Sequence, residues 1–234
     1  PGVVGALEAD DLAARLLGDR GAAMPADVVE GAQHGVPATH LDAAAARALV
    51  DSPRYLAGWV DPTVGLVDPG KLVWGLADAA ERLGVRLHED TTVTAFDRED
   101  GAVVVRTEWG SVRADRVVLG TGAFRGPLKR LALWTLPVYD HVLMSEPLSP
   151  AQLDAVGWQG REGLTDAGNQ FHYYRRTLDD RVLFGGYDAN YHFPGKIDPR
   201  LEQSESHDLR ARHFFDIFPQ LEGLRFTHAW GGAI

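Results

Sequence analysis

The clearest hydrophobic pattern lies between residues 68 and 84. Asp68 followed by Pro69 is typical of a helix start, because Asp accepts the first free N–H groups and Pro lacks the N–H that would stay unpaired there. Apolar residues then recur three and four positions apart as far as Leu83, and Gly84 is typical of the position after a helix. This pattern predicts a helix over residues 70–83 that packs one face on a sheet.

Short apolar runs follow this helix and predict strands. Two strands are expected at 85–87 and 91–96, and a hairpin turning at Trp109-Gly110 is expected over 102–108 and 111–114. Val117 to Leu119 form a continuous apolar run, which is typical of a strand covered on both faces. The run ends at Gly120-Thr-Gly122, and ligands of open α/β sheets bind beyond the carboxyl ends of the strands.

The rest of the chain predicts helices around a second sheet. Helices are expected at Leu7 to Leu17, at Leu41 to Val50 with Asp42 as cap, and over 128–133, 147–156 and 198–218, with loops at Gly58-Trp59 and Asp61-Pro62. Strands are expected over 135–146, 170–177, 181–187 and 224–230. The predicted class is α+β, a mixed α/β fold in which a parallel sheet carries an antiparallel excursion and an antiparallel sheet flanked by helices follows.

Composition limits the function classes. With 234 residues, of which 45% are hydrophobic, the chain can form one large or two small domains. Its 23 basic and 33 acidic residues give a net charge of −10, which disfavours nucleic acid and anionic membranes as partners. The absence of Cys excludes disulfides and thiolate metal sites. No apolar run reaches the ~20 residues of a membrane span and no signal segment opens the chain, so a cytoplasmic location is expected.

The side chains that could bind a substrate lie on the strand predicted at 170–177. Side chains alternate along a strand, so Phe171, Tyr173 and Arg175 share one face, and His172, Tyr174 and Arg176 share the other. Aromatic rings beside an Arg suit a carboxylate-bearing amine, because guanidinium binds carboxylates through two hydrogen bonds. A purely structural sheet with solvated arginines is the alternative. The nine histidines show no pair at metal-ligand spacing on one face, and no G-x-S-x-G elbow of a hydrolase occurs.

Four segments share one recognisable pattern, namely Asp68 to Val93, Asp115 to Ala123, Phe171 to Gly186 and Thr227 to Gly232. Together they resemble the D-amino-acid oxidase-like family of FAD-dependent oxidoreductases, which includes glycine oxidase, sarcosine oxidase, D-amino-acid dehydrogenase and γ-glutamylputrescine oxidase. Phe171 to Gly186 is similar to the hairpin of the family's substrate domain, and Thr227 to Gly232 is similar to the strand that returns toward the flavin. The resemblance covers nearly the whole chain from about residue 35.

The resemblance implies FAD as cofactor and oxidation of a C–N bond in a small amine or amino acid. It divides the chain into a helical and loop segment (1–62), a partial FAD-binding domain (63–125) and a substrate-binding domain (126–234). The family's G-x-G-x-x-G turn is absent, and its C-terminal glycine-rich flavin contact would begin where residues 232–234 stop. We therefore expect a central portion of such an enzyme, inactive and without FAD when isolated.

Carried over to this sequence, the family's motifs suggest cofactor contacts at Val93, Thr121 and Gly122, and substrate contacts at Tyr173, Arg175 and Tyr187. No catalytic residue is assigned, because hydride transfer from a neutral amine requires no protein acid or base. An ordinary core valine is the alternative for Val93. Two other functions stay open, namely a flavoprotein that oxidises the C–O bond of a hydroxy acid and a non-catalytic binding module. The sequence leaves the electron acceptor and the oligomeric state open.

Overall fold

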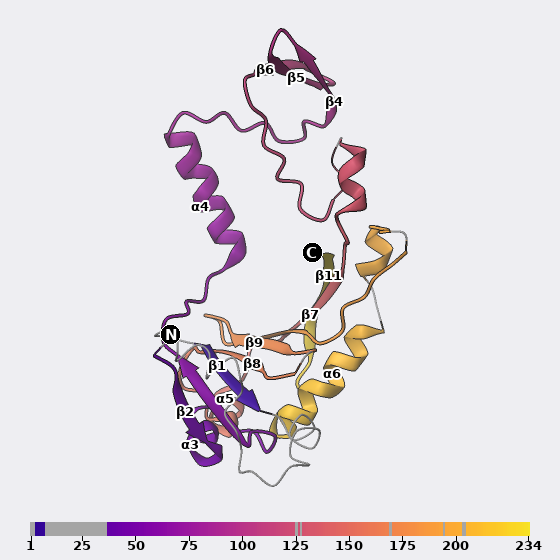
Figure 1. Cartoon of the computed structure of the whole chain (residues 1–234). Coiled ribbons are helices and arrows are strands. Elements are labelled where there is room, and N and C mark those ends of the chain that lie inside the picture. The colour runs from indigo at the N-terminus through magenta and orange to yellow at the C-terminus, as the bar shows by residue number, and fades with distance from the viewer. Residues whose placement is uncertain are drawn as a thin grey trace. The chain divides into compact units, whose positions relative to one another are not determined.

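The computed structural model describes residues 3–7, 37–124, 126, 128–168, 170–193, 195–202 and 205–234. The chain divides into two compact units (Figure 1). Unit 1 takes the residues up to Leu66, then Tyr139–Asn190 and Asp198–Gly232, and unit 2 takes Val67–Val138, Tyr191–Ile197 and Ala233–Ile234.

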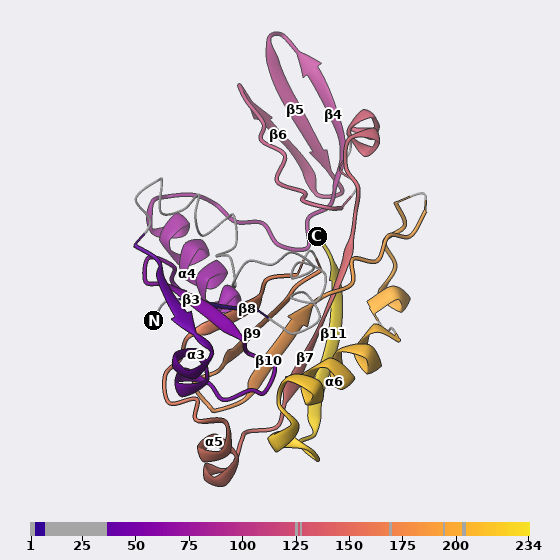
Figure 2. The same ribbon diagram turned by 60° about the horizontal axis from the view of Figure 1, so that its bottom comes forward.

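Unit 1 is built on an eight-stranded sheet, here called sheet A, with the strand order β11-β7-β10-β9-β8-β1-β3-β2 (Figure 2). β1 and β8 run parallel, whereas β8, β9, β10 and β7 form an antiparallel series. The strands are β1 (Val3–Leu7), β2 (Thr39–Asp42), β3 (Ala57–Asp61), β7 (Tyr139–Ser145), β8 (Gly163–Asp166), β9 (His172–Arg176), β10 (Val182–Gly186) and β11 (Phe226–Ala233).

Several strands of sheet A differ from the sequence prediction. Leu7 ends β1 instead of beginning a helix, and the rest of that predicted helix lies outside the described residues. The loop predicted at Gly58-Trp59 is wrong, because both residues lie in β3, and β2 and β8 were not predicted. These strands are only four or five residues long and pair with distant segments, so the local pattern carries little of the information that forms them.

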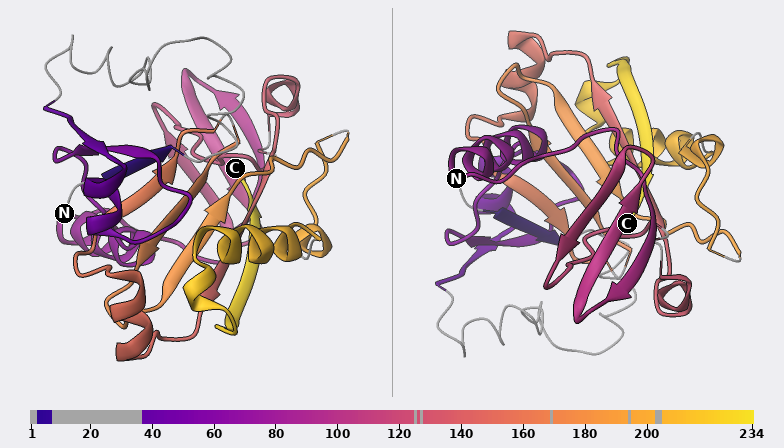
Figure 3. Two further views of the ribbon diagram at one scale, coloured as in Figure 1. Left: turned by 90° about the horizontal axis from the view of Figure 1, so that it is seen from below. Right: turned by 90° about the horizontal axis from the view of Figure 1, so that it is seen from above.

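Helices cover the core face of sheet A. They are α3 (Ala43–Leu49), α5 (Pro150–Val156), α6 (Ser206–Ile217) and the 3₁₀ turns η2 (Pro199–Glu202) and η3 (Pro219–Leu221). Asp42 caps α3 as predicted, whereas the single helix predicted over 198–218 is replaced by η2 and α6. α6 lies across β7 and β10 (Figure 3).

Aromatic packing forms the core between α6 and the sheet. Tyr174 and Phe184 from the strands pack with Phe214 and Phe218 at ring-centroid distances of 5.4 to 5.9 Å. The Tyr174 hydroxyl lies 2.7 Å from the Tyr55 hydroxyl, so two buried polar groups satisfy each other. Large aromatic rings bury 150–250 Å² each, and this cluster therefore fixes the face of β9 that carries Tyr174.

Unit 2 contains α4 (Pro69–Arg82), η1 (Lys129–Leu133) and sheet B, the antiparallel meander of β4 (Val93–Glu99), β5 (Ala102–Thr107) and β6 (Gly110–Ala114). The predicted start and end of α4 are confirmed, since an Asp68 carboxylate oxygen accepts the Lys71 N–H at 3.1 Å and Gly84 has a φ of +89°. The predicted packing of α4 on a sheet is wrong within the described chain, where no residue of this helix is buried.

Two predicted strands of unit 2 are also wrong. Residues 85–87 and 115–120 form no strand, and Val118 is 92% exposed. A strand persists only when neighbouring strands pair its N–H and C=O groups, and in the described part of unit 2 sheet B consists of β4, β5 and β6. The parallel sheet expected here is therefore not formed, although the mixed α/β class is confirmed. Among the described residues, no helix is long and apolar enough to cross a membrane.

Candidate functional site

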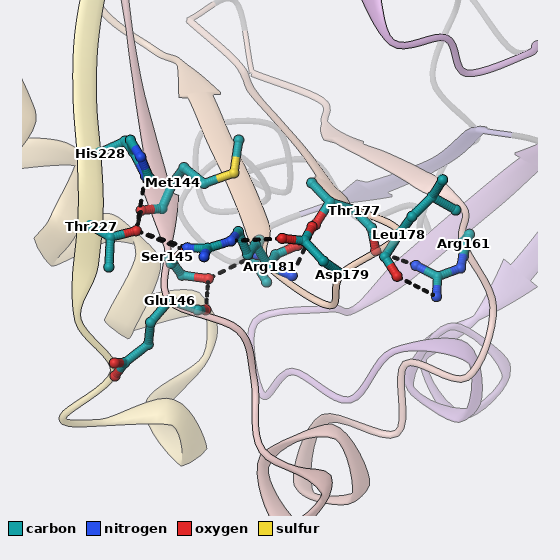
Figure 4. Close-up of polar contacts among 11 residues, drawn as sticks. Met144, Ser145, Glu146, Arg161, Thr177, Leu178, Asp179, Arg181, Thr227 and His228 are labelled. Carbon is teal, nitrogen blue, oxygen red and sulfur yellow. Dashed lines mark hydrogen bonds and ion pairs between the residues drawn. The ribbon is translucent and has the colours of Figure 1, made fainter.

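The hairpin of β9 and β10 is held in one register by its turn. Thr177 and Arg181 close the turn with N–H to oxygen distances of 2.8 and 2.9 Å. The Arg181 guanidinium bonds the Asp179 carboxylate at 2.8 Å, and it also donates to the Ser145 carbonyl and the Thr227 hydroxyl at 3.0 Å each (Figure 4). These bonds tie the turn to β7 and β11. Because a slip of one residue would exchange the two faces of the hairpin, the turn decides which side chains the site contains.

The predicted alternation along β9 is confirmed. His172 and Tyr174 are buried on the face that α6 covers, whereas Tyr173 and Arg175 are half-buried on the opposite face. We call that opposite face the open face of sheet A. Arg176 is not a solvated arginine: its guanidinium donates to the Trp158 carbonyl and, at 3.2 Å, to the Gln159 carbonyl. The arginine that shares the face of Tyr173 is therefore Arg175.

The side chain of Tyr173 lies across β10, because the residue that pairs with it there is Gly185, which has no side chain to occupy that space. A Cβ at Gly185 would lie 2.5 Å from the phenol Cζ of Tyr173, closer than any real contact. The hydroxyl donates to Oδ2 of Asp140 on β7 at 2.5 Å. Burial, followed by the hydrogen bond to Asp140, raises the pKa of the Tyr173 hydroxyl well above its usual range. Tyr173 is therefore a neutral hydrogen-bond donor and not a base.

Asp140 belongs to a group of charged side chains that the sequence did not indicate. Its Oδ1 accepts the His141 N–H at 2.8 Å and lies 3.6 Å from Nη2 of Arg210, which comes from α6 and is fully buried. The same Nη2 lies 2.5 Å from Oδ1 of Asp188. The alignment is not that of a hydrogen bond, so the contact is an ion pair. We call Asp140, Asp188 and Arg210 the Arg210 network.

Asp188 is the carboxylate of the Arg210 network that lies closer to Arg210. Its Oδ2 accepts the Ser206 hydroxyl and, at 3.1 Å, the Asn190 side-chain amide. Burial raises the pKa of Asp188, but the Ser206 hydrogen bond and the charge of Arg210 outweigh burial, so the pKa lies below its ordinary value. Asp188 is therefore ionised at neutral pH.

A second buried group lies on the core face. Oδ2 of Asp166 is 2.5 Å from Nδ1 of His172, and Nε2 of His172 is 2.9 Å from Nδ1 of His213. Tyr187 stacks on His172 with the ring centroids 4.9 Å apart, and its φ is +75°. Since His172 belongs to the core face, the structure does not bring Tyr187 together with Tyr173 and Arg175. Burial, followed by the charge of His172, lowers the pKa of His213.

Unit 2 holds a pocket of about 560 Å³ beside the turn at residues 121–124. Thr121 and Gly122 line it, together with Lys129 and Trp134. Gly122 has a φ of +56°, and a Cβ there would meet nothing within 4 Å, so its backbone is open to a ligand. Val93 is half-buried and pairs with Thr107 on β4, and it does not line this pocket. Among the described residues, no group of three His, Cys, Asp or Glu side chains is placed to hold a metal ion.

Comparisons with known proteins agree with the sequence resemblance. The sequence model of the family described as FAD dependent oxidoreductase matches residues 6–234. The probable oxidoreductase OrdL of Rhizobium meliloti is 30% identical over 189 residues, which are 78% of this chain and 40% of that protein. The gamma-glutamylputrescine oxidoreductase of Escherichia coli is 30% identical over 194 residues, which are 82% of this chain and 43% of that protein. The chain thus spans about two fifths of the length of these relatives.

Solved structures agree on the fold. Glycine oxidase from Bacillus cereus superposes with a TM-score of 0.74 at 19% sequence identity, and the match covers 99% of this chain and 59% of that one. At this identity the likeness shows the fold alone.

Proposed function

The chain belongs to the family of FAD-dependent oxidoreductases, and we propose that the protein containing it oxidises the C–N bond of a small amine or amino acid, with FAD as hydride acceptor. The observation that carries the proposal is the open face of sheet A. There Tyr173 and Arg175 share one side of β9, and the Asp140 carboxylate accepts a hydrogen bond from the Tyr173 hydroxyl.

The chemistry of these three side chains suits an amine that also carries a carboxylate. Arg175 offers a guanidinium for the carboxylate, the Tyr173 hydroxyl orients the substrate, and Asp140 offers an acceptor for N–H groups. A carboxylate beside the hairpin favours an amine over a hydroxy acid, because negative charge attracts the cationic form in which most amines arrive. Oxidation of a hydroxy acid is the alternative that Asp140 disfavours.

The protein's part in the reaction is binding and orientation. FAD, when bound, accepts the hydrogen of the substrate C–H bond together with its electron pair. Tyr173 does not take up a proton, because its raised pKa keeps it neutral. We propose that an amine arriving as an ammonium ion releases its proton to water before the C–H bond breaks. The lone pair of the neutral nitrogen then forms the C=N bond as the hydride leaves, so no protein base is needed.

We also propose that unit 2 contributes cofactor contacts. The open backbone of Gly122 and the Thr121 side chain fit one side of a flat, partly apolar cofactor in the pocket beside them. We propose that the backbone of Val93 contacts the adenine of the cofactor. The chain has no G-x-G-x-x-G turn for the pyrophosphate, so the isolated chain is expected to bind no FAD. The cytoplasmic location expected from the sequence stays a prediction.

The proposal is tested by flavin reduction in the natural polypeptide that contains this chain. Under anaerobic conditions, addition of an amine such as sarcosine or a diamine is expected to bleach the visible absorbance of the flavin, whichever electron acceptor the protein uses. Hydroxy acids of matched size are expected to leave it unchanged. Bleaching by hydroxy acids but by no amine would refute the proposed reaction. A yellow preparation of residues 1–234 alone would refute the prediction that this chain holds no FAD.

A further inference from the structure

We propose that Tyr187 is a positioning residue, whose ring fixes the backbone at Asp188 and, through the Arg210 network, the orientation of the Tyr173 hydroxyl. The inference rests on the proposed function, in which Tyr173 orients the substrate, and it adds a residue of the core face to that site. Three observations carry it, namely the strained backbone at Tyr187, the contacts of its ring, and the link from Asp188 to Tyr173.

Tyr187 has an unusual backbone conformation. Its φ is +75°, in the left-handed region that a large L side chain rarely adopts. Gly186 before it has a φ of +94°, and a Cβ there would overlap the Phe171 carbonyl oxygen, so only glycine fits at that position. The Tyr187 N–H donates to the same oxygen at 2.7 Å. A bulky residue stays in such a conformation only when its surroundings hold it there.

The rings of His172 and His213 hold the Tyr187 side chain. The Tyr187 ring stacks on that of His172 with the centroids 4.9 Å apart and an interplanar angle of 14°. It meets the ring of His213 edge to face, with the centroids 4.4 Å apart. Ring pairs in these arrangements attract each other beyond the effect of the area that they bury. Two such contacts keep the Tyr187 ring in one place and with it the strained backbone.

His172 is a rigid support for Tyr187, because hydrogen bonds occupy both of its ring nitrogens. Nδ1 lies 2.5 Å from Oδ2 of Asp166, and Nε2 lies 2.9 Å from Nδ1 of His213. Oδ1 of Asp166 accepts the backbone N–H of His172 at 3.0 Å. Both Asp166 and His172 are buried, and breaking the hydrogen bonds of buried polar groups is costly. This buried group on the core face therefore anchors Tyr187.

Asp188 follows Tyr187 directly, so the φ of Tyr187 decides where Asp188 lies. Oδ1 of Asp188 is 2.5 Å from Nη2 of Arg210, and the same Nη2 is 3.6 Å from Oδ1 of Asp140, which accepts the hydrogen bond of Tyr173 through Oδ2. An ordinary negative φ at Tyr187 would take Asp188 away from Arg210. Because Arg210 is fully buried, water cannot replace the lost carboxylate. Arg210 would then turn toward Asp140 and move the acceptor of the Tyr173 hydroxyl.

The first test compares Tyr187 variants of the natural polypeptide loaded with FAD, using the amine, sarcosine or a diamine, that bleaches the flavin. Tyr187→Phe keeps the ring and is expected to change KM less than about threefold. Tyr187→Ala lacks the ring that holds the positive φ. Its KM is expected to rise about tenfold, while kcat stays within about threefold of the wild type.

Tyr187→Gly separates positioning from direct contact with the substrate. Like the alanine variant it lacks the ring, but glycine adopts a positive φ readily, so its KM is expected to lie between those of Tyr187→Phe and Tyr187→Ala. A ring that bound the substrate directly would be lost equally in both variants. Equal KM values for Tyr187→Gly and Tyr187→Ala would therefore overturn the positioning role.

Asp100→Ala is the matched control for backbone strain. Asp100 also has a positive φ, +47°, beside a glycine, but it lies in the exposed turn between β4 and β5. This variant is expected to leave KM unchanged. The route through Asp188 is tested by a double-mutant cycle: in the Asp188→Asn background, Tyr187→Ala is expected to raise KM less than about threefold. The full effect of Tyr187→Ala in that background would overturn the route.

A second measurement requires no turnover. In protein isotope-labelled at the tyrosine Cζ atoms, the Tyr173 signal is the one missing from the NMR spectrum of Tyr173→Phe, and its chemical shift reports the hydrogen bond to Asp140. It is expected to move in Tyr187→Ala and to stay in Tyr187→Phe and Asp100→Ala. A Tyr173 signal that stays in Tyr187→Ala overturns the inference.

Should Tyr187→Ala fail to fold, Tyr187→Gly takes its place in the NMR experiment, because glycine accepts the backbone conformation without strain. Its Tyr173 signal is expected to be shifted, and a signal identical to that of the wild type overturns the inference. Since the chemical shift does not depend on catalysis, it reports on Tyr187 even if no amine reduces the flavin, which would be a failure of the proposed function.

Discussion

Substitution of Gly185 by Ala tests whether the glycine in β10 allows Tyr173 to reach Asp140. The added methyl group would lie 2.5 Å from Cζ, 2.6 Å from the hydroxyl oxygen and 2.8 Å from Cε2 of Tyr173. The backbone itself accepts alanine, because Gly185 does not have a positive φ. The substitution therefore perturbs the contact with the Tyr173 ring and little else.

The expected effect follows from these distances. To restore an ordinary contact of about 3.4 Å, the ring must move by roughly 0.9 Å, the difference between 3.4 and 2.5 Å. The Tyr173 hydroxyl then leaves the 2.5 Å bond to Asp140, and a hydrogen bond to a charged group is worth about 1.5 to 3 kcal/mol. Alanine recovers about 0.5 to 1 kcal/mol through the lower entropy of the unfolded chain. The net expectation is a loss of about 1 to 2 kcal/mol.

The measurement that isolates this effect is the titration of Tyr173 by ultraviolet absorbance, with the Tyr173→Phe spectrum subtracted to remove the other tyrosines. In the wild type the Tyr173 pKa is raised by burial and by its hydrogen bond to Asp140. In Gly185→Ala the pKa is expected to fall toward the usual value near 10. Urea denaturation of the same protein measures the free energy of unfolding.

Gly232→Ala is the matched control, because Gly232 also lies in a strand of sheet A and a Cβ there would meet nothing within 4 Å. This control is expected to leave both the titration and the stability unchanged. If Gly185→Ala behaves like Gly232→Ala, the account of Tyr173 lying across β10 against Asp140 is refuted.

Three further predictions follow from the described contacts. Tyr173→Phe removes the donor to Asp140 and is expected to raise the KM for an amine several-fold while the protein stays folded by circular dichroism; an unchanged KM would exclude Tyr173 from substrate binding. Ser149→Ala removes the reciprocal cap of α5 with Gln152. Urea denaturation is expected to show a free energy of unfolding that is lower by about 1 kcal/mol, whereas a decrease smaller than a few tenths of a kcal/mol would contradict a stabilising cap. The pKa of His213 is lowered in the folded protein, so the unfolded chain binds the proton more readily and stability is expected to fall as the pH drops below about 6.5. His213→Gln is expected to flatten this pH dependence, and an unchanged slope in that variant would refute the assignment.

Short-range sequence patterns determined much of the local structure. Asp68, Pro69 and Gly84 mark the ends of α4, and the alternation along β9 correctly places Tyr173 opposite Tyr174. These features depend on residues within one turn or one strand of each other, where spacing alone decides which groups meet. The sequence resemblance also identified the family, which the match over residues 6–234 confirms.

Strand pairing was decided only by the tertiary structure. Val117 to Leu119 have the composition of a buried strand, yet they form none, because composition cannot supply the neighbour that pairs the backbone. Conversely, β3 contains a Gly-Trp pair whose local sequence is typical of a loop. The segment forms a strand because β1 and β2 pair with its backbone.

The candidate site shows the same division. The sequence indicated Tyr173 and Arg175 as side chains that share a face, but it gave no indication that Asp140, 33 residues away, would accept the Tyr173 hydroxyl. Nor did it indicate that Arg210 would come from α6 to pair with Asp188 and Asp140. Ion pairs and hydrogen bonds between distant segments depend on the register of β7, β9 and β10 and on the docking of α6. The sequence alone therefore determined which residues face the same way, and the tertiary structure decided which charges meet.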